Sequence, residues 1–364
     1  MEFGIQFFPD VGPQHKPADR YFREALALVQ QAEPLGYTHV RIVEHHFHYY
    51  GGYSPNPCVF LSAAAAVTST MRLVTGAVLP AFANPLKLAG EIGMLDAISN
   101  GRLDVGFARA FLPHEFRRFG VSPDESVARY REGIEQVEML LTEENVTHEG
   151  QFHRIRETTV LPRPTQQPRP PFYVAALGTP ASFEYAGTQG HNIMCVPMLG
   201  AAMKELIGLY REARAKAGHA GPGEVMLAHH MFCHPDGAKA REIARPQLDA
   251  YLKSLVEGAS DWLTGMSSAD YPGYDKIIEM MRAENTDTQI AKGAAWIGTP
   301  QEIIDNIRMY QEETGGFEHA SLQVNFHNMP FAEAERSMKM FAEDVMPAFG
   351  RGPAQRPMTA PYPS

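Results

Sequence analysis

A short apolar segment near the N-terminus is followed at once by a cluster of ionisable side chains. Residues 40–43 read Val-Arg-Ile-Val, and Glu44, His45, His46 and His48 come directly after them. Alternating aliphatic residues predict a buried parallel strand, and barrel enzymes present catalytic side chains at the carboxyl ends of such strands. An imidazole, with an ordinary pKa of about 6.5, can exchange a proton near neutral pH. The residue types alone leave open whether these rings do chemistry or only hydrogen-bond their neighbours.

Metal-dependent hydrolysis is one alternative use of these histidines. A second group, His229, His230 and His234, could add metal ligands if the fold brought the two groups together. Such sites draw ligands from several strand ends, yet two expected strands end in Ala176-Leu177 and Val196-Pro197, which offer none. The sequence therefore indicates no metal site, and a metal-dependent barrel hydrolase stays only as an alternative.

The elements that would position these residues alternate along the chain. Eight strands in alternation with helices predict an α/β fold, a (β/α)₈ TIM barrel, in one domain over residues 1–349. The expected strands are 3–8, 39–44, 73–80, 103–109, 172–177, 191–196, 224–234 and 320–326, and the expected helices lie near 18–34, 57–68, 85–98, 180–189, 200–217, 236–257 and 331–346.

Three segments depart from this alternation. Residues 143–171 contain an expected hairpin at 146–153 and a Pro-rich stretch that should run extended into the fifth strand. Residues 258–298 form a long insertion, for which we expect an active-site lid. The Pro-rich residues 350–364 are expected to be a disordered tail.

Composition argues against several classes of protein. The formal net charge of −10, without a Lys/Arg block, argues against a nucleic-acid surface or a basic membrane patch. No run approaches the ~20 apolar residues of a membrane helix, and the N-terminus reads as a strand rather than a signal peptide. Cys58, Cys195 and Cys233 lack CxxC spacing, which fits a reducing cytoplasm. No GxGxxG between a strand and a helix marks a Rossmann site for NAD(P)H or FAD.

Short motifs stand along the chain in a definite order. They are Met1-Glu-Phe-Gly4, Glu44-His-His-Phe47, Leu79-Pro80 with Asn84-Pro85, Leu95-Asp96 with Ser99 and Gly101-Arg102, Phe107-Ala-Arg109, Phe119-Gly120, Gly298-Thr-Pro300 with Glu302, and Met338-Lys339 with Phe341, Asp344 and Pro347. This ordered series resembles the luciferase-like flavin monooxygenases, and especially the alpha subunit of bacterial luciferase. The family fold is the TIM barrel that the strand count also predicts.

The resemblance implies monooxygenation by reduced FMN (FMNH₂) and O₂ through a flavin C4a-hydroperoxide. The cofactor would carry the reaction, and the protein would bind it, orient it and exclude water. His45 matches the family's catalytic histidine and would transfer a proton, whereas His46 and His48 are expected to be structural. A separate flavin reductase would supply FMNH₂. A deazaflavin (F420)-dependent oxidoreductase on the same fold, which transfers hydride, is the alternative within this resemblance.

The resemblance also implies where FMN would bind. Arg109 matches the family's phosphate-binding arginine, and Arg129 resembles a second one. A turn at a helix start offers free amides and hydroxyls to the phosphate, although luciferase has a Glu-Ser pair where this chain has Leu177-Gly178. The turn residues are Gly178, Thr179, Pro180, Ala181 and Ser182. A small-residue segment, Thr75, Gly76 and Ala77, matches the family's non-proline cis peptide against the flavin ring.

Side chains expected at the barrel mouth would form an apolar cavity for a hydrophobic organic substrate, free or tethered to a carrier. They are Phe7, Phe8, Phe47, Ala108, Phe111, Met194, Met198, His230 and Phe326. Ala108 stands where luciferase has a reactive cysteine, so light emission is not implied. Hydroxylation, aldehyde oxidation and Baeyer-Villiger insertion all stay open, and a cytoplasmic homodimer is expected.

Overall fold

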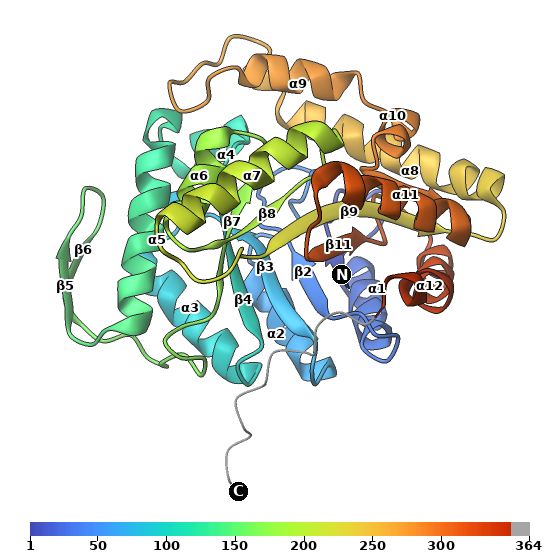
Figure 1. Cartoon of the computed structure of the whole chain (residues 1–364). Helices are drawn as coiled ribbons and strands as arrows, with labels where there is room; N and C mark the ends of the chain where they lie inside the picture. The colour runs from blue at the N-terminus through green and yellow to red at the C-terminus, as the bar shows by residue number, and fades with distance from the viewer. Residues whose placement is uncertain (351–364) are drawn as a thin grey trace, which may run out of the picture.

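The computed structural model describes residues 1–350, and its centre is a closed parallel barrel (Figure 1). The barrel strands pair in the order β9-β11-β1-β2-β3-β4-β7-β8, and β8 pairs with β9 to close the ring. This confirms the TIM barrel and the eight expected strands. They are β1 (Glu2–Phe7), β2 (His39–Ile42), β3 (Arg72–Val78), β4 (Leu103–Ala108), β7 (Phe172–Ala176), β8 (Asn192–Cys195), β9 (Val225–Cys233) and β11 (His319–Gln323).

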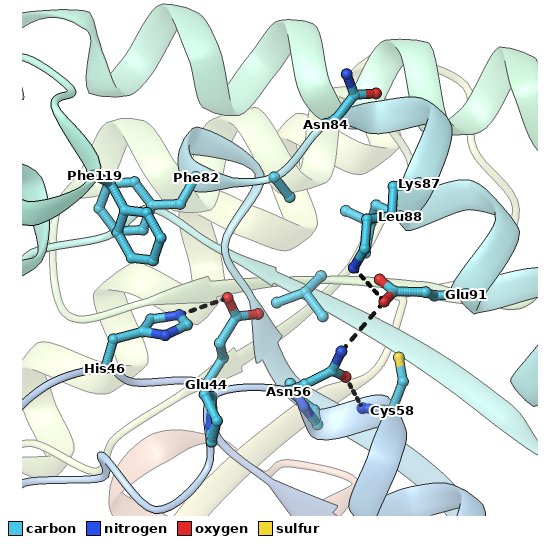
Figure 2. Close-up of a pocket in the computed structure, with 14 residues that line it drawn as sticks. Glu44, His46, Asn56, Cys58, Phe82, Asn84, Lys87, Leu88, Glu91 and Phe119 are labelled. Atoms are coloured by element: carbon cyan, nitrogen blue, oxygen red, sulfur yellow. Dashed lines mark hydrogen bonds and ion pairs between the residues drawn. The ribbon is translucent and has the colours of Figure 1, made fainter.

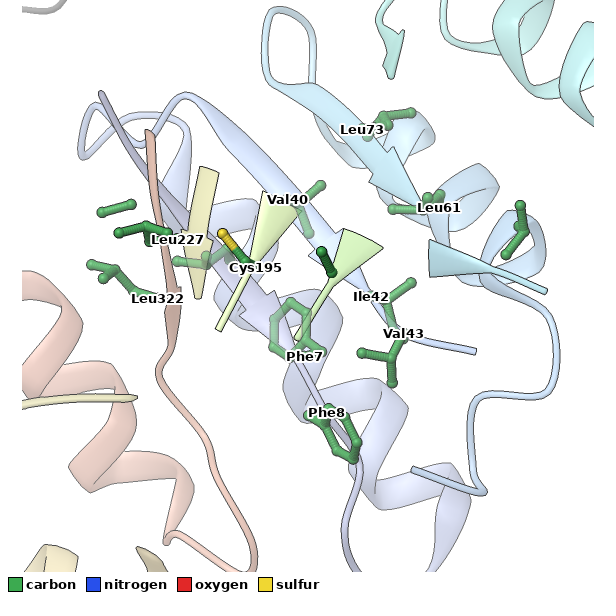
Figure 3. Packing of buried hydrophobic residues seen from close by; sticks show 14 of the residues in the cluster. Phe7, Phe8, Val40, Ile42, Val43, Leu61, Leu73, Cys195, Leu227 and Leu322 are labelled. Carbon is green, nitrogen blue, oxygen red and sulfur yellow. The ribbon is translucent and has the colours of Figure 1, made fainter. Parts of the chain in front are cut away.

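Helices cover the outside of the barrel (Figure 1). Several begin where the sequence supplies a cap and a proline, as Asn56 and Pro57 do for α2, because a capped first turn satisfies free amides. An apolar layer joins helices to strands, and Figure 3 shows Leu61 of α2 with Val40 and Ile42 of β2. The helices are α1 (Ala18–Ala32), α2 (Pro57–Val67), α3 (Pro85–Ile98), α4 (Pro113–Phe119), α5 (Ser126–Thr142), α6 (Pro180–Thr188), α7 (Gly200–Lys216), α8 (Gly237–Gly258), α11 (Pro300–Thr314) and α12 (Phe331–Met340).

The long insertion is built from short elements rather than from one loop. It contains a 3₁₀ turn (Ser260–Trp262), α9 (Tyr274–Arg282), α10 (Thr286–Ala291) and β10 (Ala295–Gly298). β10 pairs in parallel with the C-terminal part of β9, so the barrel sheet gains a strand that the sequence pattern does not predict. The insertion packs over the end of β4, where the Trp262 Nε1 donates to the Phe111 carbonyl at 2.8 Å.

The expected hairpin is confirmed as β5 (Val146–Glu149) and β6 (Arg154–Thr158), which pair antiparallel beside α5 (Figure 1). The carboxylate of Glu132 on α5 accepts the backbone amides of residues 151–153, which fixes the hairpin turn on that helix. Within residues 1–350, no helix is long and apolar enough to cross a bilayer. The expected disordered tail, residues 351–364, lies outside the described residues.

A partly buried ionic cluster lies at the amino-terminal ends of β1, β9 and β11. The His319 ring lies between two carboxylates, with Nδ1 3.2 Å from Glu2 and Nε2 3.5 Å from Glu224. Burial alone would lower the pKa of His319, but Glu2 and Glu224 outweigh it and raise the pKa to about 9. The protonated ring therefore stabilises this end of the barrel.

We expect this contribution to depend on pH in a defined direction. Because the folded pKa of about 9 lies above the usual value, the stabilisation is complete below about pH 6.5 and is lost as the pH rises toward 9. The difference in unfolding free energy between wild type and His319→Gln should shrink by up to about 3 kcal/mol over that window. Urea unfolding at several pH values measures it, and a difference that does not change with pH would contradict the assignment.

Candidate active site

His45 lies just beyond the carboxyl end of β2 and is held there from two sides. Its side chain is buried, and its backbone amide donates to the Ser54 carbonyl at 3.1 Å. Its ring Nδ1 lies 3.2 Å from Oε1 of Glu115, which is completely buried on α4. The same Oε1 accepts the amide of His46 at 2.8 Å, so one carboxylate fixes both the ring and the backbone that carries it.

The Glu115 carboxylate determines which ring nitrogen of His45 can work. An ionised carboxylate only accepts, so the proton on the Glu115 side belongs to Nδ1, and Nε2 is the nitrogen that can exchange a proton with a ligand. No group within residues 1–350 hydrogen-bonds Nε2. Sequence reasoning missed Glu115, because it is 70 residues from His45 and its only signal is an acid between the apolar Leu112 and Phe116.

Gly51 makes room for His45. A Cβ added there would lie 2.7 Å from both Cβ and Cδ2 of His45, and the residue has a φ of +79°, which L side chains rarely adopt. The loop over residues 49–54 can therefore close over the histidine only with glycine at this position.

Aromatic side chains surround His45 at the barrel mouth. Its ring lies 5.4 Å from Phe8, 5.4 Å from Tyr50 and 5.9 Å from Phe111, measured between centroids. Phe8 also packs on Tyr251, which lies 4.6 Å from His230. The structure thus gathers several of the expected pocket residues around His45, namely Phe8, Phe111, His230 and Phe326, and adds Tyr50 and Tyr251 to them.

Two expected pocket residues lie elsewhere. Phe7 is buried behind the barrel wall, 5.4 Å from Phe60 of α2, because successive strand residues point to opposite faces and Phe8 takes the inner one. Phe47 is 55% exposed and packs on Phe119, since a φ of +64° turns the chain outward there. Placing them in the pocket was wrong.

The remaining expected pocket residues line other parts of the barrel. Met194 is fully buried in a separate interior cluster with Val74, Tyr173 and Met226. Ala108 packs against both this cluster and the main core. Met198 lies against Gly178, where an added Cβ would come within 3.0 Å of its sulfur.

His46 and Glu44 face a different cavity, on the other side of the strand end from His45. His46 Nε2 lies 3.1 Å from Glu44 Oε1, and burial raises the pKa of Glu44 (Figure 2). The cavity measures about 200 Å³ and also contains Asn56 and Glu91. The alternation of side chains along residues 44–46 thus separates His46 from the aromatic pocket.

The small-residue segment of β3 has an unusual backbone. The Gly76–Ala77 peptide is cis, as the resemblance implied, and the ladder with β4 shifts register between Thr75 and Val78. The Thr75 hydroxyl donates to the Gly106 carbonyl at 3.0 Å and accepts the Gly106 amide at 2.8 Å, so it joins the strands where the ladder is irregular. The guanidinium of Arg41 donates to the Gly76 carbonyl at 3.0 Å.

Of the expected phosphate residues, Arg109 and Arg129 differ in their surroundings. The Arg109 guanidinium lies 4.3 Å from the ring centroid of Tyr271 in the insertion, and no carboxylate within residues 1–350 pairs with it. Arg129 pairs with Glu125 at 2.8 Å and lies over Phe152 of the hairpin turn, so its charge is already compensated.

The Gly178 turn does begin a helix. Thr179 is the cap residue of α6, but its hydroxyl makes no capping bond, and its carbonyl accepts the Ser182 amide at 2.9 Å. The Ala181 amide and the Thr179 and Ser182 hydroxyls are therefore available to an anion.

The histidines do not assemble a metal site. His229 faces outward and stacks on Trp296 at 4.0 Å, whereas His230 faces inward and His234 is partly exposed near Asp236. Within the described part of the chain, no three His, Cys, Asp or Glu side chains are placed to hold a metal ion. The hydrolase alternative gains no support from this geometry.

Comparison with known proteins gives a consistent picture. The family model for luciferase-like monooxygenases matches residues 1–316. The oxygenase component of a flavin-dependent trigonelline monooxygenase from Acinetobacter baylyi is 31% identical, over 98% of each chain. The crystal structure of monooxygenase RslO1 from Streptomyces bottropensis is 43% identical with a TM-score of 0.86, over 96% of this chain and 100% of that one.

More distant relatives include a second monooxygenase and an F420-dependent dehydrogenase. The alkanal monooxygenase alpha chain of Photorhabdus luminescens is 26% identical over 95% of this chain and 96% of its own. An F420-dependent glucose-6-phosphate dehydrogenase of Intrasporangium calvum is 29% identical over 89% of this chain and 94% of its own. The resemblance to luciferase alpha is confirmed, and the same likeness extends to F420-dependent enzymes.

Proposed function

The chain belongs to the luciferase-like monooxygenase family and is an oxidoreductase, and on this premise we propose that it is an FMNH₂-dependent monooxygenase of a hydrophobic organic substrate. The observation that carries the proposal is the His45–Glu115 pair inside an aromatic pocket at the barrel mouth. A proton carrier fixed by a buried carboxylate and enclosed by apolar rings suits an oxygenation from which water must be excluded. When bound, reduced FMN would supply the activation of O₂.

The residues around the proposed cofactor site fit a flavin phosphate and a flavin ring. Arg109 is a cation without an acidic partner in the described chain, and the Ala181 amide and the Ser182 hydroxyl can add further donors. The Gly76–Ala77 segment offers a backbone surface without large side chains for the ring. His45 Nε2 would hold or deliver the proton that the oxygenation requires.

We propose that the reduced cofactor comes from a partner flavin reductase in the cytoplasm. The A. baylyi relative is described as an oxygenase component, which favours a two-component system here as well. The pocket of Phe8, Tyr50, Phe111, Tyr251 and Phe326 favours a hydrophobic substrate, and hydroxylation, aldehyde oxidation and Baeyer-Villiger insertion are all compatible with it.

An F420-dependent oxidoreductase is the second candidate, because the I. calvum relative is 29% identical. Anaerobic titration of the protein with reduced FMN, oxidised FMN and reduced F420 separates the two. We expect reduced FMN to bind best and to reoxidise on the protein when O₂ is added. Binding of F420 alone would replace the proposal with hydride transfer, and binding of neither cofactor would reject both.

Arg109→Ala should weaken FMN binding by about 1.5 to 3 kcal/mol, the range for a lost hydrogen bond to a charged group. Arg129→Ala serves as the comparison, and its effect should be smaller because Glu125 already compensates Arg129. Anaerobic titration gives the two affinities, and circular dichroism checks folding. Equal affinities in wild type and Arg109→Ala would remove Arg109 from the cofactor site.

His45→Ala should lower turnover by roughly 10² to 10⁴ while FMNH₂ still binds, because the variant loses a general acid-base group. His46→Ala is the matched control, and its effect should be much milder because its ring faces the separate cavity with Glu44. Single-turnover mixing with O₂, followed by the return of oxidised-flavin absorbance, separates chemistry from binding. A near-wild-type rate in His45→Ala would disprove the role.

We also propose a homodimer that uses α2 and α3. Large apolar side chains on these neighbouring helices are exposed, with Val59 at 70%, Met94 at 58% and Ile98 at 48%. Met94→Glu should therefore dissociate the dimer, whereas Met280→Glu, at an equally exposed site on α9, should not. Sedimentation equilibrium measures both, and a monomeric wild type would reject the interface.

A further inference from the structure

Four polar side chains form a continuous belt across adjacent strands of the barrel. In the strand register, His230 of β9 lies beside Gln323 of β11, Gln323 beside Gln6 of β1, and Gln6 beside Arg41 of β2. The Arg41 guanidinium then donates to the Gly76 carbonyl of β3 at 3.0 Å. All four side chains are buried. The belt therefore ends at the cis Gly76–Ala77 peptide.

The belt faces the interior of the barrel. Val40 and Ile42, on either side of Arg41, pack in the apolar layer with Leu61 of α2, which leaves the inner face to Arg41 (Figure 3). His229 likewise packs outward on Trp296, so His230 points inward to Phe326. The interior of a TIM barrel is ordinarily filled by apolar side chains, so a cationic belt at this level requires a reason.

Among the described residues, several polar atoms of the belt lack a hydrogen-bond partner, and its cation lacks a counter-ion. Arg41 donates to the neutral oxygens of Gln6, at 2.7 Å, and Gly76, and no carboxylate within residues 1–350 pairs with it. Arg41 Nε, Gln323 Nε2 and His230 Nε2 are buried and lack any partner in the described chain. Burial lowers the pKa of Arg41 to about 10, so the side chain is still cationic near neutral pH. A buried cation without a counter-ion is costly, and an anionic ligand would offset that cost.

Because Gly76 has no side chain, the Arg41 guanidinium can contact the backbone where the flavin ring is proposed to bind. A Cβ at Gly76 would lie 2.1 Å from Arg41 Nε, so the unpartnered donor occupies the space that a side chain would otherwise fill. The proposed function places the flavin ring against the Gly76–Ala77 peptide. Because the Arg41 guanidinium contacts the Gly76 carbonyl, it would then lie close to the ring.

We propose that Arg41 and the belt with Gln6, Gln323 and His230 recognise the charge state of the flavin ring. Two-electron reduction with the uptake of one proton gives the anionic reduced ring, FMNH⁻, with the charge on its N1–C2=O edge, whereas the oxidised ring is neutral. A fixed cation at that edge favours the reduced form, because the charge-charge attraction exists only in that state. The inference rests on the proposed function and identifies the residue that would make the protein prefer reduced to oxidised FMN.

The test compares affinities for reduced and oxidised FMN in wild type, Arg41→Met and Arg41→Lys. Arg41→Met should lower the preference for the reduced form at least tenfold, which equals a shift of about −30 mV in the midpoint potential of the bound flavin. Affinity for oxidised FMN should change much less. Arg41→Lys keeps the charge and should keep most of the preference. Anaerobic titration gives the affinities, and the potential is measured independently of turnover.

Arg102→Met is the matched control. Arg102 is also a buried arginine with neutral partners, but it donates to the carbonyls of Ser99, Met71 and Ala65 at 2.7, 2.8 and 3.0 Å and is fully engaged. Its loss should lower stability and leave the reduced-to-oxidised ratio unchanged. Arg41→Met should fold, because replacing an unpaired buried charge by an apolar side chain is often neutral or stabilising.

The outcomes distinguish a failure of the inference about Arg41 from a failure of the proposed function. If wild type prefers reduced FMN and Arg41→Met keeps that preference, the inference about Arg41 is wrong and the proposed function stands. If wild type binds neither form of FMN, the proposed function fails and the inference fails with it. If Arg41→Met does not fold, Arg41→Gln repeats the test with an uncharged donor, and an unchanged ratio in that variant overturns the inference equally.

Discussion

The buried carboxylate of Glu115 is the interaction on which the candidate active site depends. It accepts the His46 amide and contacts the His45 ring, so it joins the chain after β2 to α4, the helix that follows β4. Its second oxygen is buried and has no partner in the described chain, which makes the carboxylate costly to bury for structural reasons alone. The cost is explained if the carboxylate is needed to orient His45 and to stabilise the charged imidazole during proton transfer.

The alternation of side chains across the barrel wall then divides the molecule into two environments. Phe8, Arg41 and His230 face inward, whereas their neighbours face outward: Phe7 and Ile42 pack in the layer beneath the helices, and His229 stacks on Trp296 of β10. The rings of Phe8 and His230 face the barrel mouth, and Arg41 places a positive charge inside the barrel. The outward side chains supply packing contacts that stabilise the fold. We therefore expect a substitution of an outward residue to change stability, and a substitution of its inward neighbour to change the chemistry of the site.

This division also explains what the sequence could predict. Strands and helices follow from local periodicity, and all eight barrel strands were found within two or three residues at each end. β10 was missed because four residues inside a polar insertion give no periodic signal. Phe7 was misplaced because its inward or outward orientation depends on where the strand begins. Glu115 and the partners of Arg41 could not be predicted, since these contacts join residues 35 to 70 positions apart.

Within residues 1–350, the cationic side chains at the site have no acidic partner, and the buried acid of the site is not paired with a guanidinium. Arg41 and Arg109 are cations without acidic partners in the described chain, and the buried acid of the site, Glu115, contacts the His45 ring and the His46 amide instead of a guanidinium. If the charges served only stability, pairing Glu115 with a guanidinium would cost less than burying each apart. Keeping them apart leaves two positive positions for an anionic ligand, Arg41 inside the barrel near the carboxyl end of β2 and Arg109 just beyond the end of β4. A flavin has two separated regions of negative charge, its phosphate and its reduced ring, and Arg109 and Arg41 would each compensate one of them, while the acid acts only through His45.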